Sequence, residues 1–191
     1  MSFVPVLTLS KWAHYSWLPR GERALSERAQ ADANASLLAR FAPLTSGRAI
    51  APVPPFAALP RPACAKVMRV AAAFANARSL RRVVSATARE MFASLVGPQV
   101  LSAIQRNARP GFVDIDVGAT LNVFDRADMT AAGLQIALHA IDDPAGRVLL
   151  QLRLPVAVAQ RASRFQASDI SPQAASDVLE AAYALAGGKA C

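Results

Sequence analysis

The 191-residue sequence contains little cysteine and little histidine, two residues of each. Cys64 and Cys191 lie far apart in the chain, and no C-x-x-C pair occurs. Together with His14 and His139 they are scattered too widely for the short ligand spacings of a zinc site. We therefore expect a reducing compartment, with neither a structural disulfide nor a bound metal.

Long apolar runs are also missing. The most apolar stretches, VMRVAAAFANA and VLLQLRLPVAVA, are interrupted by Arg, Gln or Pro well before the ~20 residues that cross a bilayer. The beginning of the chain, MSFVPVLTLSKWAHY, lacks the basic start and long apolar run of a secretory signal. These absences predict a cytoplasmic protein that does not insert into a membrane.

Glycine-rich phosphate loops are absent too. Neither G-x-x-x-x-G-K-[ST] nor G-x-G-x-x-G occurs, and AGGKA near the end of the chain follows a predicted helix where a phosphate loop would precede one. The sequence thus indicates no nucleotide and no other cofactor.

Candidate catalytic groups are few. Asp114 with Asp116, and Asp142 with Asp143, could act as paired carboxylates. A solvated strand face explains the first pair more simply, and helix-ending turn chemistry next to a proline explains the second. Cys64 could be a nucleophile at a helix start, but it lacks an obvious His or Asn partner. We expect no catalytic residue, and a small enzyme using these groups ranks last among the functions considered.

What the sequence does have is positive charge. The formal net charge is +8 and the isoelectric point is about 10.7. Acidic or phosphate-bearing partners suit such a chain, and a nucleic-acid-binding helical protein is one hypothesis. No aromatic residue interleaves with the central arginines to stack bases, so the outer face of amphipathic helices explains them better. These arginines are Arg69, Arg78, Arg81, Arg82 and Arg89.

Hydrophobic residues make up 53% of the chain and charged residues 18%, which predicts a folded protein with a sizeable core. We expect a mainly α, single-domain protein over residues 1–191, with at most one or two short strands. An aromatic N-terminal segment (1–20) precedes the first helix. A Pro-rich segment (43–62) forms an extended strap or a mobile linker, of which the strap is favoured because it carries large apolar residues. A helical core (63–191) follows.

Helical spacing of apolar residues and terminal signals place the helices. The first covers residues 21–41. From Ala63 there are two helices or one broken near Ala77, followed by a helix that starts at Pro98 and closes at Pro110–Gly111. Another runs from about residue 120 and ends at Pro144 and Gly146. The last begins with Ser171 as N-cap and Pro172 at the first helical position.

Two segments are harder to assign. Residues 112–118 alternate apolar residues with aspartates, which favours a short extended segment. Residues 147–158 could form a strand or a short helix, since short apolar runs look alike in periodicity. His139, between Leu138 and Ile141 in a helical pattern, is more simply a partly buried histidine than a metal ligand.

The stretch SKWAHYSWLPRGER (residues 10–23) concentrates both tryptophans of the chain, and three segments including it resemble one family. HYSWLP resembles an element near the start of the SctK family, accessory proteins of the bacterial type III secretion sorting platform. VMRVAAAFANARSLRRVVSATAREMFASLVGPQVLSAIQR looks like that family's central helical segment. AAGLQIALHAIDDPAGRVLLQLRLP is similar to its later helix closing in LRLP. The resemblance covers most of residues 12–155, although the family's proline between the histidine and the serine is missing here.

The resemblance implies a non-enzymatic cytosolic adaptor beneath the membrane-embedded ring of the secretion apparatus. Such a protein would join the inner-ring protein SctD to the pod protein SctQ, would not bind nucleic acid, and is expected to be a monomer by itself. Trp17 would pack on the helical body, with Pro19 turning the chain toward the first helix. The candidate partner-binding residues are Trp12, Tyr15, Trp17, Arg78, Arg81 and Arg82, since aromatic residues and arginine dominate binding hot spots.

Overall fold

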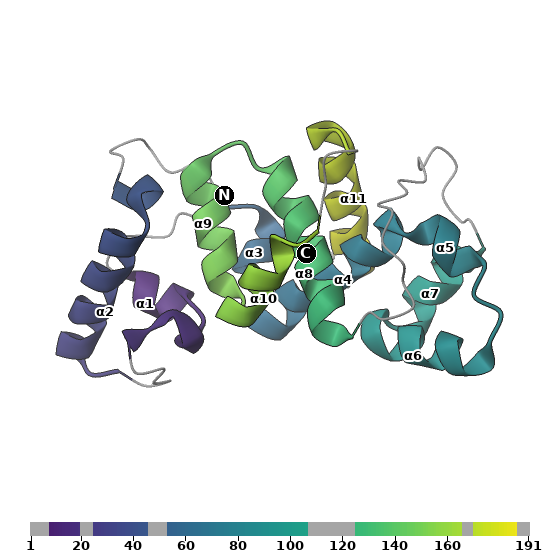
Figure 1. Cartoon of the computed structure of the whole chain (residues 1–191), viewed down its shortest axis with the longest axis horizontal. Helices are drawn as coiled ribbons and strands as arrows, with labels where there is room; N and C mark the ends of the chain where they lie inside the picture. Colours follow the sequence, from purple (N-terminus) through teal and green to yellow (C-terminus); the bar gives the residue numbers. More distant parts are fainter. Residues whose placement is uncertain (1–7, 20–24, 46–52, 107–124, 166–169, 187–191) are drawn as a thin grey trace. The chain divides into compact units, whose positions relative to one another are not determined.

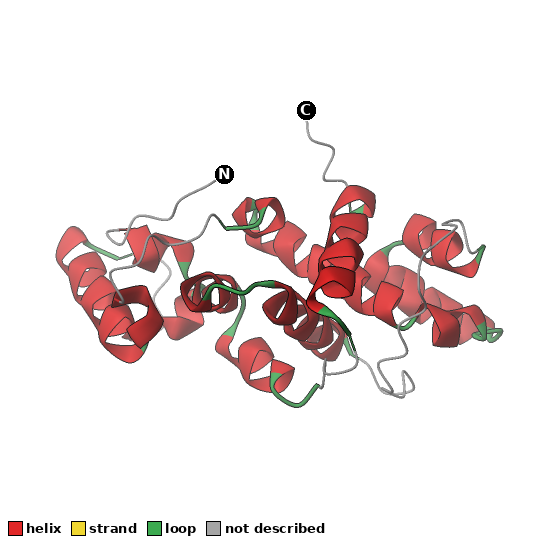
Figure 2. Cartoon of the chain, turned by 90° about the horizontal axis from the view of Figure 1, so that it is seen from above, coloured by secondary structure: helices red, strands yellow, loops and turns green. Residues whose placement is uncertain are grey.

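The structure is a computed structural model that describes residues 8–19, 25–45, 53–106, 125–165 and 170–186. Within these ranges every regular element is an α-helix or a 3₁₀ helix, and there is no strand (Figure 2). The predicted mainly α fold is confirmed. The expected extended segment at 112–118 and the helix end at Pro110–Gly111 lie outside the described residues. No helix in the described ranges has the length and apolar character needed to span a membrane.

The chain divides into two compact units. Unit 1 comprises residues 1–64 and 141–160, and unit 2 comprises residues 65–140 and 161–191. Each unit is therefore built from two separate stretches of sequence, and the expected single domain stays a prediction.

In unit 1, α1 and α2 pack side by side, and the 3₁₀ helix η4 contacts both α2 and α9 (Figure 1). Ser26 begins α2, where its hydroxyl accepts a hydrogen bond from Ala29 N at 3.3 Å. The helices that lie wholly in unit 1 are α1 (Leu9–Trp12), η2 (Tyr15–Trp17), α2 (Glu27–Arg40), η4 (Ala42–Thr45), α3 (Pro55–Ala58) and α9 (Pro144–Arg153). Two others, α4 (Arg61–Ala75) and α10 (Val156–Ala162), have residues in both units.

The described part of the Pro-rich segment is helical only in places: η4, α3 and the start of α4 fall within it, whereas Val53, Pro54, Leu59 and Pro60 lie outside any helix. The predicted extended strap is therefore interrupted by helical turns. Pro55 occupies the first turn of α3, a position that loses no hydrogen bond because the first amides of a helix have no internal partner. Val53 and Phe56 are buried. That burial agrees with a segment packed on the core and not with a solvated linker.

The region around Pro144 also differs from the prediction. The preceding helix, α8 (Arg126–Ala140), ends before this proline, and Pro144 begins α9. The carboxylate of Asp143 caps α9 by accepting a hydrogen bond from Gly146 N at 2.6 Å. Asp143 and Pro144 are therefore helix-starting residues, and the ambiguous residues 147–158 are helical, with a break at Leu154–Pro155.

In unit 2, α11 (Pro172–Leu185) packs on α8, while α7 (Pro98–Gln105) contacts α5 (Ala77–Arg81) and α6 (Ala86–Val96). The predicted starts at Pro98 and at Ser171–Pro172 are confirmed, and Ser171 Oγ accepts from Ala174 N at 3.2 Å. The predicted break near Ala77 falls at Asn76. A second break, between Arg81 and Ala86, was not predicted.

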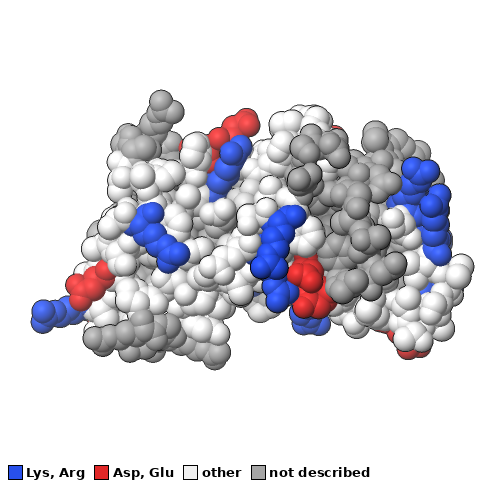
Figure 3. Space-filling model, viewed as in Figure 1, with Lys and Arg blue, Asp and Glu red and all other residues white. Residues whose placement is uncertain are grey.

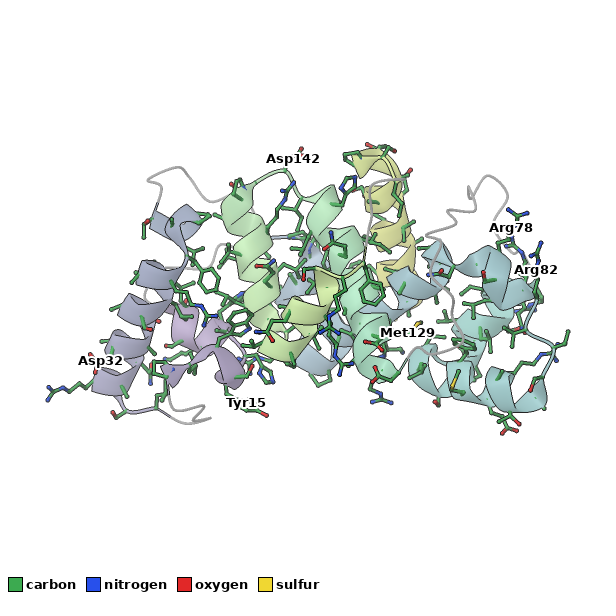
Figure 4. All side chains as sticks on the ribbon, viewed as in Figure 1. Tyr15, Asp32, Arg78, Arg82, Met129 and Asp142 are labelled. Atoms are coloured by element: carbon green, nitrogen blue, oxygen red, sulfur yellow. The ribbon has the colours of Figure 1, made fainter. Side chains whose placement is uncertain are left out.

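A glycine sets the distance between α8 and α4. A Cβ atom built on Gly133 would lie 2.8 Å from Met68 Cα and closer still to the Met68 carbonyl group. Met68 and Met129 are both fully buried in unit 2, and Figure 4 labels Met129 on α8. Backbone thus packs against backbone at this position, which only glycine allows.

Candidate functional site

The aromatic segment, which we define as residues 8–19, is fastened to the end of α9. The indole nitrogen of Trp12 donates to Leu149 O and that of Trp17 to Leu154 O, each at 2.7 Å. His14 N donates to Leu152 O at 2.6 Å. The last four carbonyls of a helix have no internal donor, so His14 N supplies the partner that Leu152 O lacks within α9, while the two indoles bond to Leu149 O inside the helix and to Leu154 O directly after it.

Both tryptophans, Trp12 and Trp17, are half-buried. Trp17 packs on the helical body as expected. Its ring meets Phe41 edge-on at 5.6 Å between centroids, and the Arg40 guanidinium lies 5.2 Å from its ring centre. The indole N–H groups are used within unit 1, and only the exposed parts of the rings remain available to a partner.

Two arginines that the sequence analysis did not single out, Arg61 and Arg153, donate hydrogen bonds to backbone carbonyls of the aromatic segment. Arg153 is 8% exposed, and its guanidinium carbon lies 4.5 Å from the Trp12 ring centre. It donates to Ala57 O at 3.0 Å, to Trp12 O at 3.2 Å and to Leu59 O. Burial lowers the pKa of Arg153, a shift that the nearby Cys64 opposes and the Arg61 guanidinium adds to.

Arg61, at the start of α4, makes a similar set of bonds. Its guanidinium donates to the backbone carbonyls of Lys11, Trp12 and Ala13, at 2.9, 3.3 and 2.5 Å. A sequence signal existed for Arg153, because it stands on the apolar face of α9, four residues after the buried Leu149. An arginine at such a position must find buried acceptors.

Tyr15 and His14 are half-buried at the edge of the segment. Their rings lie 4.2 Å apart between centroids, and His14 Nδ1 accepts from Ser16 N at 3.2 Å. Tyr15 projects away from the ribbon (Figure 4). Of the three aromatic candidates, Tyr15 alone has its polar end directed outward.

The predicted arginine site lies in unit 2. Arg78 and Arg82 are exposed and Arg81 is half-buried, all at or directly after α5. Basic side chains gather over this end of unit 2 (Figure 3), and Figure 4 labels Arg78 and Arg82 there. We call Arg78, Arg81 and Arg82 the α5 arginine cluster. Val84, 80% exposed, and Met91, 41% exposed, follow it closely in the chain.

Arg69 does not belong to this surface, which corrects the interpretation of the arginine series as one outer face. It is buried, and its Nε donates to Leu95 O at 2.8 Å. Burial, with a smaller contribution from Arg126, lowers its pKa. Arg69 joins α4 to the end of α6, so its role is structural.

The remaining sequence candidates are scattered. Cys64 is fully buried in α4, and burial raises its thiol pKa to about 11, against a smaller opposing effect of Arg153. A thiol with that pKa is a poor nucleophile at neutral pH. The pair Asp114 and Asp116 lies outside the described residues. Within the described ranges no three His, Cys, Asp or Glu side chains group as metal ligands.

The fold and these contacts define a mainly helical protein. Its aromatic segment is hydrogen-bonded within unit 1, and its basic surface, the α5 arginine cluster, belongs to unit 2. Comparison of the chain with protein-family models, with curated proteins and with solved structures found no match in any of the three. Its function is therefore inferred from its residues and their contacts.

Proposed function

We propose that this chain is a non-enzymatic adaptor of a bacterial type III secretion system. It would link an SctD-like inner-ring protein to an SctQ-like pod protein at the cytosolic face of the inner membrane. The proposal starts from the three SctK-like segments described above, and is supported by how those segments contact one another.

The observation that carries the proposal is the contact between SWLP (residues 16–19) and LRLP (residues 152–155). These two stretches are separated by more than a hundred residues of sequence. Trp17 Nε1 donates to Leu154 O at 2.7 Å, and Val156 N donates to Ser16 Oγ at 3.0 Å. The first and the last resembling segments are thus hydrogen-bonded to each other, as expected if both belong to one structural unit.

A second contact supports the same proposal in unit 2. Gly133 lies near the start of the later resembling segment, in GLQIALHA. Met68 lies in the central segment, in VMRV. Their backbones meet at a distance that excludes any side chain on residue 133. In unit 2 the resembling segments thus meet at a position where only glycine fits.

The α5 arginine cluster is the surface we assign to a protein partner. Arginine is enriched at binding hot spots and methionine at interfaces, and the exposed Val84 and Met91 follow the cluster in the chain. An acidic partner surface would complement the charge.

The test is co-purification of the tagged chain from its own cells after mild crosslinking, with mass spectrometry of the bound proteins in moderate salt. We expect inner-ring and pod proteins with the wild-type chain and their loss with Arg78→Ser/Arg82→Ser. A matched control, Arg28→Ser/Arg164→Ser, removes the same charge from exposed positions elsewhere and should retain both partners. Absence of secretion components from the wild-type sample would refute the proposal.

The alternative is a nucleic-acid-binding protein, which the α5 arginine cluster also favours. Such binding would weaken steeply with salt, and its salt dependence would become shallower in Arg78→Ser/Arg82→Ser. Electrophoretic mobility shifts of duplex and single-stranded DNA at low and moderate salt test it. A shift lost in this variant and kept in the control, without secretion partners in the crosslinked sample, would replace the adaptor proposal.

A further inference from the structure

Unit 1 contains a cavity of about 890 Å³ beneath the aromatic segment. Its volume lies within the range of sites that enclose small ligands or short peptide segments. The cavity is bounded by the aromatic segment, by α2 and by the start of α4, with Arg153 of α9. The lining residues used in the argument are Ser10, Lys11, Tyr15, Leu18, Arg61 and Arg153.

The lining carries three cationic side chains, those of Lys11, Arg61 and Arg153, and no described acidic residue. The two guanidinium groups donate to backbone carbonyls, which are neutral acceptors. No carboxylate forms an ion pair with any of the three in the part of the chain that the structure describes. Backbone carbonyl dipoles therefore solvate the positive charge of the cavity, but no described carboxylate neutralises it. Such a charge attracts an anion.

Unused hydrogen-bond donors point to the same kind of ligand. Ser10 is 6% exposed, and its hydroxyl is buried without a hydrogen-bond partner among the described residues. Arg61 Nε is likewise buried and unpartnered. Buried donors are nearly always satisfied in folded proteins. A hydroxyl and a guanidinium N–H with no partner, in a cationic lining, are the groups that bind an oxyanion.

Most of the remaining lining is apolar or aromatic, with Gln30 and His14 as its polar members. Leu18 and Leu25 lie on the cavity wall, and Tyr15 contributes an aromatic ring. A free inorganic anion would leave these surfaces uncovered, whereas a peptide with apolar side chains beside its carboxylates would cover them. The size of the cavity also exceeds what a single small anion needs.

We propose that this cavity binds an acidic peptide segment of a partner protein, with a carboxylate accepting hydrogen bonds from Ser10 Oγ and Arg61 Nε. Both donors are buried in the chain by itself, so the neighbouring side chains must move aside to admit the carboxylate. Lys11, which is exposed, contributes long-range attraction at the cavity. This binding site is independent of the secretion-system assignment and of the α5 arginine cluster. Failure of either proposal therefore leaves the other standing.

The test is a titration of the full chain with the capped peptide LDELDL, followed by tryptophan fluorescence. Both tryptophans of the chain belong to the aromatic segment, and the Trp12 ring stacks on Arg153, so the signal reports on the cavity. The neutral peptide LNQLNL and hexathymidylate serve as comparison ligands. We expect saturable binding of the acidic peptide with a Kd below about 0.1 mM and no binding of the neutral peptide.

Ser10→Ala should weaken binding about tenfold, because it removes one hydrogen bond to a charged group. Lys11→Gln should weaken it about threefold, as expected for an exposed charge. Lys66→Gln, the matched control, removes the same charge from unit 2 and should bind like the wild type. The Ser10 hydroxyl has no partner among the described residues, so the Ser10→Ala chain should keep the wild-type helical circular dichroism signal.

Three results would overturn the proposal. The first is absence of a saturable response to LDELDL, and the second is equal affinity for LNQLNL. The third is wild-type affinity in both Ser10→Ala and Lys11→Gln. Tighter binding of hexathymidylate that these two substitutions weaken would also overturn it, since the cavity would then bind phosphates of a nucleic acid.

Discussion

Gly133→Ala is the most informative single substitution for the packing of unit 2. The added Cβ would lie 2.8 Å from Met68 Cα and closer to the Met68 carbonyl carbon and oxygen. All three atoms belong to the backbone of α4, so no side chain can rotate to make room. The two helices must separate by roughly 1 Å or more before the contact becomes an ordinary van der Waals distance.

The magnitude follows from two opposing effects. Alanine is favoured over glycine inside a helix by about 1 kcal/mol. Forcing extra volume into a close-packed core costs about 1–3 kcal/mol when side chains and backbone can adjust, and more when they cannot. Separation of α8 and α4 would also loosen contacts of Met68, Met129 and Leu134, all fully buried. We expect a net loss of about 3 kcal/mol, a large part of a typical folding free energy.

The assay is urea unfolding followed by circular dichroism for both units and by tryptophan fluorescence for unit 1, which holds both tryptophans. Gly146→Ala provides a matched control in α9. Its Cβ would meet Ile141 Cγ2 at 3.2 Å and Asp143 Oδ2 at 3.3 Å, contacts that shifts of a few tenths of an ångström relieve without breaking the Asp143 cap. We expect its stability within about 1 kcal/mol of the wild type. Equal stability of Gly133→Ala and Gly146→Ala would refute the packing argument.

Three further predictions concern single residues. Trp17→Phe keeps an aromatic ring but leaves Leu154 O without its indole donor, and should lower the free energy of unfolding of unit 1 by about 1 kcal/mol in the fluorescence of the remaining tryptophan; an unchanged midpoint would show that the bond adds nothing. Cys64, with a pKa raised to about 11, should react with iodoacetamide far more slowly in the folded chain than in urea, as followed by peptide mass spectrometry; rapid labelling at pH 7 would contradict its burial. Asp125 accepts from Asp128 N at 2.7 Å at the start of α8, and this bond is the main cause of its lowered pKa, helped by Arg161. A lowered carboxyl pKa stabilises the fold above the unfolded pKa near ~3.9 and ceases to do so as the pH falls through the folded value. Asp125→Ala should therefore cost about 1 kcal/mol at pH 7 and less below about pH 4 in thermal unfolding; a cost that does not change with pH would exclude the charge as its cause.

The elements that could be predicted from sequence are those decided within a few residues. Ser171 and Pro172 begin α11 because a hydroxyl and a proline satisfy the same local requirement in any helix start. Pro98 begins α7 for the same reason. Pro144 shows the limit of such reasoning, because a proline between two helical patterns fits the end of one helix and the start of the next. The Asp143 cap decides between them.

The candidate sites divide in the same way. The aromatic segment and the α5 arginine cluster could be identified from composition, since tryptophans and adjacent arginines are visible in the sequence. The roles of Arg61 and Arg153 could not, because their carbonyl partners come from the aromatic segment and from around α3, distant in sequence. Arg69 was wrongly grouped with the exposed arginines. Helical periodicity does not distinguish a solvated arginine from one that donates a hydrogen bond to the end of another helix.

The sequence by itself determined the helical class, the starts of α7 and α11 and the basic character of this protein, because propensity, capping and charge act over short distances. Tertiary structure alone decided which arginines are buried, that the indole N–H groups serve the end of α9, and that Gly133 must remain a glycine. Each of these depends on a backbone atom brought close by folding, and no local pattern in the chain records which atom that will be.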